Sequence, residues 1–450
     1  MSADSPSDAV SRPVGGTEYS WCRAVPGGTG VSVLALLFSK SPNLSHLQTC
    51  IHKLQDSHPI LRSKLRFDPS TNAFSFLTPS TPSALQIRTS DVSQSFYLTL
   101  EHEMNTNPWS HHEDQVTETD VMFASFYSLP DQKWSVILQL HTGVCDRASA
   151  AFLLRELLGL LGDGGGGERE IVKENGVGLA IEDCIPAGKA NKPFWARGVD
   201  MLGYSVNSFR FSNLEFKETG KPTSTEFVRL NIGLDDTDRI LSGCRSRGIK
   251  LSALLAAAGF IATYASKNLP DDKWEKYSLA TLIDCRPLLD PVLSDHHIGF
   301  YHSAVVNSHD VKGKEDLWDL AQRVHTSLET AKNNGKHFTD MADLNFLMLK
   351  AIDNPGLTQS SSLRTSLISV FEDAISQNTE QFHKDVGLLD CIGCASVHGV
   401  SPSLAMFDVI HDGELDCVCV YPSPTHSREQ MQDFVDHMKK ILLGSADTPQ

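Results

Sequence analysis

The sequence predicts a mixed α/β (α+β) protein with two domains, and three observations lead to this prediction. At 450 residues, the chain is too long for one ordinary hydrophobic core. Apolar runs of strand length are interspersed with amphipathic stretches of helix length. The two halves also repeat one order of elements, namely strands, a long helix, a strand and a helix. We therefore expect two units, each containing both strands and helices.

The first half begins after a polar stretch, residues 1–20, that we expect to be disordered or loosely attached. The N-terminal domain is then expected at 21–195. Its predicted elements are strand 31–37, helix 43–56, a strand pair at 73–76 and 84–89, helix 93–104, strands 121–127 and 134–141, and helix 148–161. The last two strands flank a Pro130-Asp131 turn, which is typical of a β-hairpin.

The second half follows a glycine-rich break at 162–167. No strand precedes these glycines and no Lys-Ser/Thr follows them, so they indicate a surface loop rather than a phosphate cradle. A crossover linker is expected at 196–223 and the C-terminal domain at 224–450. Its predicted elements are strand 226–232, helices 235–247 and 252–267, strands 277–284 and 300–307, helices 315–333 and 340–352, strands 366–371, 388–397, 405–411 and 414–421, and helix 427–443.

Composition narrows the class of function. The formal net charge of −16 argues against nucleic acid or an anionic membrane as a partner, because no basic patch offsets the repulsion. The N-terminus lacks the apolar core of a signal peptide, and the longest apolar run, 251–265, is short for a membrane span. Ten scattered cysteines favour reduced thiols and a cytoplasmic enzyme.

Two groups of residues could bind a metal, but neither predicts a site. Cys391 and Cys394 form a CxxC pair, and Cys417 and Cys419 form a CxC pair. Both pairs lie in expected strands, where alternation places Cys417 and Cys419 on one face as core residues. The run 111–114, His-His-Glu-Asp, has consecutive side chains that point in different directions and seldom meet at one ion. We expect no metal.

The stretch 134–150, WSVILQLHTGVCDRASA, carries the strongest functional signal. An apolar strand ends at His141, and a short turn containing Asp146 precedes an amphipathic helix. Polar residues between a buried strand and a helix are placed where functional sites usually form. A histidine there can take a proton from an alcohol or an amine near neutral pH.

This stretch and four other segments together resemble the chloramphenicol-acetyltransferase-like superfamily. The segments are SHPILRSKL (57–65), NPW (107–109), LHTGVCDRAS (140–149), KLSALLAAAGF (250–260), and LIDCRPLLDP with IGFYHSAV (282–305). The superfamily includes plant BAHD acyltransferases, fungal alcohol acetyltransferases and peptide-synthetase condensation domains. The resemblance implies two subdomains, each a mixed sheet with flanking helices, and an active-site tunnel at their interface.

The resemblance also implies roles for individual residues. An acyl thioester, here acyl-CoA as co-substrate and no other cofactor, would meet a small-molecule alcohol or amine at an HHxxxD motif. The second histidine of that motif is the general base, and its aspartate pairs with an arginine of the other domain. In this chain the pair would be Asp146 and Arg286, tying the two domains together. Many members of the superfamily are monomers.

The sequence departs from the HHxxxD pattern at the base itself. Thr142 occupies the position of the second histidine, and His141 matches the first. Arg147 replaces the glycine that follows the aspartate. No DFGWG motif is present, so the alcohol-acetyltransferase and condensation branches fit better than the BAHD branch.

Three interpretations of this departure remain open. A local bulge at Thr142 could swing His141 into the base position, with Thr142 orienting the acceptor. Alternatively, His302 or His398 could supply the base from the second half. Finally, the chain could be a binding protein that keeps the tunnel, or could catalyse another condensation or cyclisation.

The preferred prediction is an acyltransferase with His141 as base and Thr142 beside it. Two further residues, Ser303 and Ser396, could line the tunnel and bind a thioester oxyanion, together with His302 and His398. For each serine, a hydroxyl satisfied by backbone is the simpler expectation.

Overall fold

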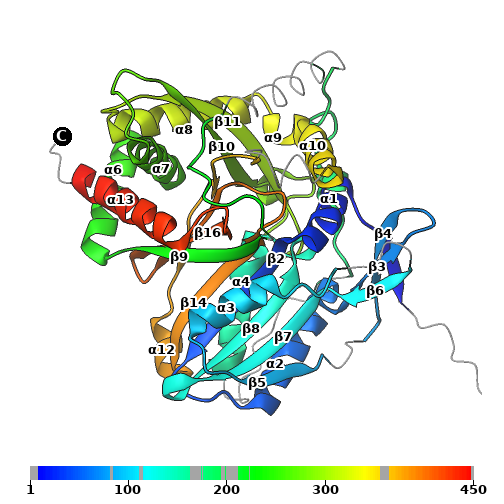
Figure 1. The fold of residues 1–450 in the computed structure, drawn as a ribbon. Helices are drawn as coiled ribbons and strands as arrows, with labels where there is room; N and C mark the ends of the chain where they lie inside the picture. The colour runs from blue at the N-terminus through cyan, green and yellow to red at the C-terminus, as the bar shows by residue number, and fades with distance from the viewer. Residues whose placement is uncertain are drawn as a thin grey trace, which may run out of the picture. The chain divides into compact units, whose positions relative to one another are not determined.

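The computed structural model describes residues 9–81, 85–110, 115–162, 174, 176–193, 198, 211–221, 223–354 and 364–446. The chain forms two compact units, each assembled from separated stretches of sequence. Unit 1 comprises residues 1–184, 286–301 and 379–396, and unit 2 comprises 185–285, 302–378 and 397–450. Each unit has its own hydrophobic core, and each contains a sheet with flanking helices (Figure 1). The predicted mixed α/β fold class is therefore confirmed.

Unit 1 is built around a five-stranded sheet with the strand order β14-β2-β8-β7-β5. β8 is antiparallel to both of its neighbours, β2 and β7, whereas β5 is parallel to β7. A second, four-stranded sheet has the order β1-β4-β3-β6. The elements of unit 1 are β1 (Val10–Pro13), α1 (Gly16–Ala24), β2 (Thr29–Phe38), α2 (Leu44–Ser57), β3 (Lys64–Asp68), β4 (Ala73–Thr78), β5 (Ile87–Asp91), α3 (Phe96–Asn105), β6 (Thr117–Asp120), β7 (Met122–Leu129), β8 (Lys133–His141), α4 (Arg147–Gly162), α12 (Glu380–Asp385) and β14 (Leu388–Val397), whose last residue falls in unit 2.

Unit 2 contains a seven-stranded mixed sheet with the order β11-β10-β12-β15-β16-β9, in which β13 also pairs with β15. The apolar helix α7 is buried almost all round and forms the centre of its core, as its alanine-rich sequence predicts. The elements are β9 (Ser224–Ile232), α6 (Leu234–Arg247), α7 (Leu251–Ser266), β10 (Glu275–Asp284), β11 (His302–Val311), α8 (Leu317–Asn333), α9 (Lys336–Thr339), α10 (Met341–Asp353), β12 (Ile368–Phe371), β13 (Ile375–Gln377), β15 (Leu404–His411), β16 (Glu414–Ser423) and α13 (Arg428–Ala446).

Local sequence signals explain many of these elements. α2 begins at a side-chain cap, since Asn43 accepts a hydrogen bond from the backbone N–H of His46 at 3.0 Å. Its buried residues recur at helical spacing, at Leu47, Ile51 and Leu54. The predicted hairpin is confirmed as β7 and β8, joined through a tight turn at Pro130–Gln132 in which Asp131 and Gln132 have positive φ.

The N-terminal stretch differs from its prediction. From Val10 onward the described residues form β1 and α1 instead of a loosely attached tail. The reason is a distant partner, because the Glu182 carboxylate accepts hydrogen bonds from the backbone N–H and the hydroxyl of Thr17, both at 2.6 Å. These bonds hold the first turn of α1, and local sequence does not show them.

Two strand predictions also need correction. The expected strand pair at 73–76 and 84–89 does not form, because β4 pairs with β3 and β1 while β5 joins the other sheet beside β7. The strand at 388–397 exists as β14, but it lies next to β2 in the sheet of unit 1. Alternation identifies a strand without indicating the sheet it joins.

The two units differ from the division at 195 and 223 expected from the sequence. Residues 286–301 and 379–396 belong to unit 1, although they follow much of unit 2 in the chain. Residues 185–195 group with unit 2. Most of the expected linker, residues 199–210, lies outside the described residues, as do 111–114 and 163–167.

Candidate functional site

The candidate site lies where β8 ends and α4 begins, in unit 1. The short helical turn η4 (Thr142–Val144) follows His141, and two residues later α4 starts at Arg147. β8 is the middle strand of the five-stranded sheet and its last eight residues are largely or fully buried, as its apolar sequence predicts. The turn is therefore fixed by a rigid strand on one side and a helix on the other.

Asp146 closes this turn and caps α4. Its Oδ1 accepts a hydrogen bond from the backbone N–H of Ser149 at 2.9 Å, and its backbone carbonyl accepts one from Ala150 at 2.8 Å. The carboxylate thus satisfies one of the N-terminal N–H groups of the helix. On the other side, Oδ2 accepts a bond from the backbone N–H of Tyr301 at 2.8 Å.

Arg286 binds the same carboxylate through both of its terminal nitrogens. Nη1 lies 2.9 Å from Oδ2 of Asp146, and Nη2 lies 3.0 Å from Oδ1. The side chains of both residues are almost fully buried, at 2% and 1% exposed. Such a bidentate contact is the strongest form of arginine–carboxylate pair. Both oxygens of Asp146 therefore accept hydrogen bonds from Arg286 and from the backbone.

The remaining bonds of Arg286 fasten the segment 286–301 to α4. Nη2 donates to the Ser149 hydroxyl at 2.8 Å, and the guanidinium donates to the His297 carbonyl oxygen. The Tyr301 ring lies 4.9 Å from the guanidinium carbon, and burial raises the pKa of its hydroxyl. Because this whole segment belongs to unit 1, the Asp146–Arg286 pair lies within one unit. The expectation of an inter-domain pair is corrected accordingly.

His141 is fully buried, and its ring is held in one orientation. Its Nδ1 accepts a hydrogen bond from the backbone N–H of Gly143 at 3.0 Å, and the Trp109 ring packs edge-on at 5.4 Å. Because Nδ1 uses its lone pair on this bond, the neutral ring carries its proton on Nε2. In this tautomer Nε2 is a donor and cannot accept a proton.

The strand β8 is regular up to His141. The β2–β8 ladder is one-to-one from Phe38↔Trp134 to Val31↔His141, so no residue shift within the strand turns His141 to the opposite face of the sheet. The ladder ends at His141, and the residues at which a bulge is expected form the turn η4.

Thr142, at the position of the family's base, is also engaged. Its Oγ1 donates to the carbonyl oxygen of Gly30 at 2.7 Å and lies 2.7 Å from the Ser32 hydroxyl. Because the Thr142 proton goes to Gly30, Ser32 must be the donor of the second bond. Thr142 is 6% exposed, and its hydroxyl is locked to the start of β2.

The other predicted residues fall into two groups. Ser396 belongs to unit 1 and accepts a hydrogen bond from the backbone N–H of Val31 at 3.0 Å, so it lies beside the strand residue that pairs with His141. His302, Ser303 and His398 belong to unit 2.

Within unit 2, each of these three side chains has local contacts. Ser303 donates to the carbonyl oxygen of His337, and the His302 ring lies 5.8 Å from Phe371. The His398 Nδ1 lies 2.9 Å from the Thr225 hydroxyl, and burial lowers the pKa of His398 to about 4, so the ring is neutral. The hydroxyls of Ser303 and Ser396 both form hydrogen bonds with backbone groups, which is the simpler of the two expectations for each serine.

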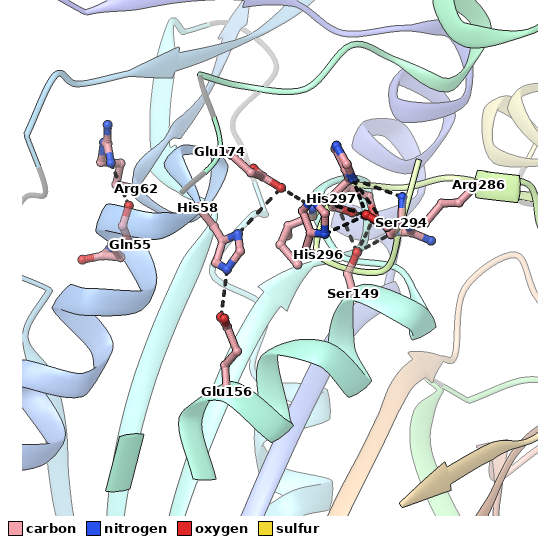
Figure 2. A network of polar contacts seen from close by, with 12 residues as sticks. Gln55, His58, Arg62, Ser149, Glu156, Glu174, Arg286, Ser294, His296 and His297 are labelled. Carbon is pink, nitrogen blue, oxygen red and sulfur yellow. Dashed lines mark hydrogen bonds and ion pairs between the residues drawn. The ribbon is translucent and has the colours of Figure 1, made fainter. Parts of the chain in front are cut away.

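One polar network near the site was missed by the sequence analysis. His58 is fully buried and lies between two glutamates, with Nε2 2.9 Å from Glu156 and Nδ1 3.7 Å from Glu174 (Figure 2). These carboxylates raise the pKa of His58 to about 9 against the opposing effect of burial. Glu174 also accepts a bond from the backbone N–H of Ile298 at 2.8 Å. The signal was available, because His58 is part of the SHPILRSKL segment that supports the resemblance.

Metals and membranes receive no support from the described part of the chain. No group of three or more histidine, cysteine, aspartate or glutamate side chains there could hold a metal ion. Cys417 and Cys419 lie in the core of unit 2, as their alternation predicts. Over the same residues, no single helix has the length and apolar character to cross a membrane, although the bent pair α6 and α7 passes that test jointly.

The geometry defines a protein with two α/β units, in which a buried aspartate–arginine pair holds a strand–turn–helix site. Comparison with solved structures identifies this fold. Trichothecene 15-O-acetyltransferase TRI3 from Fusarium sporotrichioides is similar, with a TM-score of 0.74, 14% identity, and coverage of 98% of this chain and 97% of that one. Polyketide synthase associated protein 5 from Mycobacterium tuberculosis is also similar, with a TM-score of 0.67 and 15% identity, and the match covers 98% of this chain and 99% of that one. The epimerization domain from the third module of tyrocidine synthetase B has a TM-score of 0.63 and 14% identity, and the match covers 99% of this chain and 98% of that one.

The similar solved structures share the fold of this chain. Residues 206–372 match the model of the alcohol acetyltransferase family. At these identities the structural similarities define the fold alone. A search of curated proteins finds no match.

Proposed function

We propose that this protein is an acyltransferase that moves an acyl group from a thioester, with acyl-CoA as the first choice, to an alcohol or amine of a small molecule. The observation that carries the proposal is the buried Asp146–Arg286 pair, which caps α4 and holds the turn after β8. This is the role that the resemblance gives to the aspartate of HHxxxD. The match to the alcohol acetyltransferase model and the acetyltransferase among the similar structures support it.

In this proposal, the chain's residues position the substrates more than they transfer protons. Asp146 and Arg286 hold the turn in one geometry, and proximity alone can supply a large share of the rate of a two-substrate reaction. The thioester brings its own leaving group. The initial hypothesis of His141 as base is replaced, because its tautomer leaves no acceptor at Nε2. Thr142 instead fixes the start of β2.

A second candidate function is a binding protein that recognises the same small molecules without reacting them. The observation in its favour is the engagement of both side chains at the motif, since Thr142 and His141 each accept or donate bonds to backbone. Neither side chain is poised for proton transfer.

Two measurements on the full chain separate these candidates. The first is the thermal shift given by acetyl-CoA, a longer acyl-CoA and free CoA, since a ligand stabilises the state that binds it. The second is release of free CoA in the presence of a panel of alcohols and amines. A shift that requires the acyl group, together with CoA release, supports the transferase. A shift without release supports the binding protein, and no shift with any thioester contradicts the proposed function.

A further inference from the structure

The proton-transferring groups of the motif are all occupied by bonds within unit 1. The Thr142 hydroxyl donates to Gly30 and accepts from Ser32. The Asp146 carboxylate accepts four hydrogen bonds, two from Arg286 and one each from the backbone of Ser149 and Tyr301. None of these oxygens is placed to remove a proton from an acceptor.

The two remaining side chains of the turn are equally unsuited. His141 has its Nδ1 lone pair bound to the Gly143 N–H, which leaves the proton on Nε2. The Cys145 thiol is buried beside Asp146, and both effects raise its pKa. The described side chains of the motif therefore supply no base.

The nature of the acceptor decides whether a base is needed. An alcohol is a weak nucleophile until a base takes its proton, and a general base contributes about 10²–10⁴-fold to such a step. A neutral amine already carries the lone pair that attacks a carbonyl carbon. An acyltransferase with this motif can therefore serve an amine far better than an alcohol.

We propose that the acceptor is a primary amine, attacking as the free base. This inference rests on the proposed function and narrows its substrate class. The amine nitrogen forms a bond to the thioester carbonyl carbon, the carbon–sulfur bond breaks, and sulfur leaves with the electron pair. The nitrogen then loses one proton, which the thiolate takes up directly or through solvent. The products are an amide and a free thiol.

The test compares acceptors that share one skeleton. Acetyl-CoA is the donor, 2-phenylethylamine and 2-phenylethanol are one matched pair, and glycinamide and glycolamide are another. Amide, ester and free CoA are quantified with and without the protein. We expect amide from the amines and no ester above the protein-free background. The pH profile should follow the basicity of the amine, so that glycinamide, the weaker base, reaches its plateau at lower pH than 2-phenylethylamine.

Two variants make the assay specific. Thr142→His restores a histidine at the position of the family's base, and we expect it to gain ester formation. His141→Asn keeps an oxygen in place of Nδ1 for the Gly143 N–H but cannot act as a base. It should retain amide formation with an unchanged pH profile, whereas the loss of a general base would cost about 100-fold or more. If Thr142→His fails to fold, the His141→Asn profile and the matched acceptors still decide the question.

Each outcome has a distinct meaning. Ester formation by the unmodified protein at a rate comparable to amide formation overturns the inference and leaves the proposed function standing. A pH profile that is the same for both amines, or that collapses in His141→Asn, also overturns it. Thioester binding with neither product overturns it and favours the binding protein. Absence of thioester binding contradicts the proposed function itself.

Discussion

Arg286 and Asp146 are separated by 140 residues in sequence and make two parallel contacts of 2.9 and 3.0 Å inside one compact unit. The arginine thus neutralises a buried carboxylate that also caps α4. Breaking a buried pair by removal of one partner leaves the other charge without compensation. This relationship explains how a residue from a distant part of the chain holds the turn after β8 in place.

Arg286→Met should therefore lower the free energy of unfolding by about 3–5 kcal/mol. A matched control is Arg364→Met in unit 2. Burial lowers the pKa of Arg364 to about 10, and its hydrogen bonds go to neutral groups, the carbonyl of Gly399 and the hydroxyls of Ser401 and Thr425. Its removal leaves no carboxylate uncompensated and should cost less than the Asp146–Arg286 pair, about 1–3 kcal/mol for the lost buried hydrogen bonds. Urea unfolding measures both, and equal costs would contradict the role given to Asp146.

His58 should make stability depend on pH in the alkaline range. Its pKa is raised from 6.5 to about 9 in the folded chain, so its stabilising effect is complete below the unfolded value and is lost as pH rises through 9. A shift of this size corresponds to about 3 kcal/mol at most. Unfolding free energies at about pH 6 and about pH 9.5 should differ more for the unmodified protein than for His58→Gln. The control His102→Gln, at an exposed position, should follow the unmodified protein, and parallel curves for all three would refute the assignment.

Two substitutions of His141 should separate its hydrogen bond from its ring. His141→Asn retains an acceptor for the buried N–H of Gly143, whereas His141→Ala leaves that donor unsatisfied. We expect the alanine variant to be less stable than the asparagine variant by about 1–3 kcal/mol, the cost of a buried unpaired donor. Thermal and urea unfolding of the two variants provide the measurement. Equal stability of the two variants would show that the hydrogen bond from the Gly143 N–H to His141 does not stabilise the protein.

Gly30 should resist substitution for two separate reasons. Its φ of +97° is unfavourable for a residue with a side chain, and a Cβ there would lie 3.0 Å from the Trp21 ring and 3.1 Å from the Thr142 hydroxyl. Gly30→Ala should cost at least about 1–2 kcal/mol from the backbone alone. Gly27→Ala is the control, because a Cβ at that position meets nothing within 4 Å. Similar stabilities of the two variants would show that β2 can shift to accommodate the methyl group.

Much of the fold could be predicted because its signals are local. The apolar run of β8, the Pro130 turn before it and the largely apolar helix α7 are each determined by residues close together in sequence. The turn at 142–146 could be singled out as a candidate site for the same reason. Length and the order of elements along the chain also sufficed to indicate two units.

The other features of the fold and of the candidate site depend on contacts that the hydrophobic periodicity of the sequence does not predict. α1 is held by Glu182, and β14 is a recognisable strand whose place beside β2 depends on pairing across the chain. The tautomer of His141 depends on a backbone N–H two residues away, which requires the conformation of the turn. The charge of His58 requires two glutamates from separate segments, Glu156 and Glu174.

The division of unit 1 into three stretches of chain has a consequence for its synthesis. Residues 1–184 leave the ribosome long before the segment that contains Arg286, and β14 follows later still. A nascent chain that ends before Arg286 must keep Asp146 hydrated or unpaired, and a chain that ends before β14 leaves one edge of β2 open. Unit 1 therefore cannot reach its final state until residues 185–285 and 302–378 of unit 2 have been synthesised, whereas an N-terminal domain usually folds first. Released fragments that end near residue 195 should accordingly depend on chaperones and aggregate, whereas the complete chain should fold as one interdependent product.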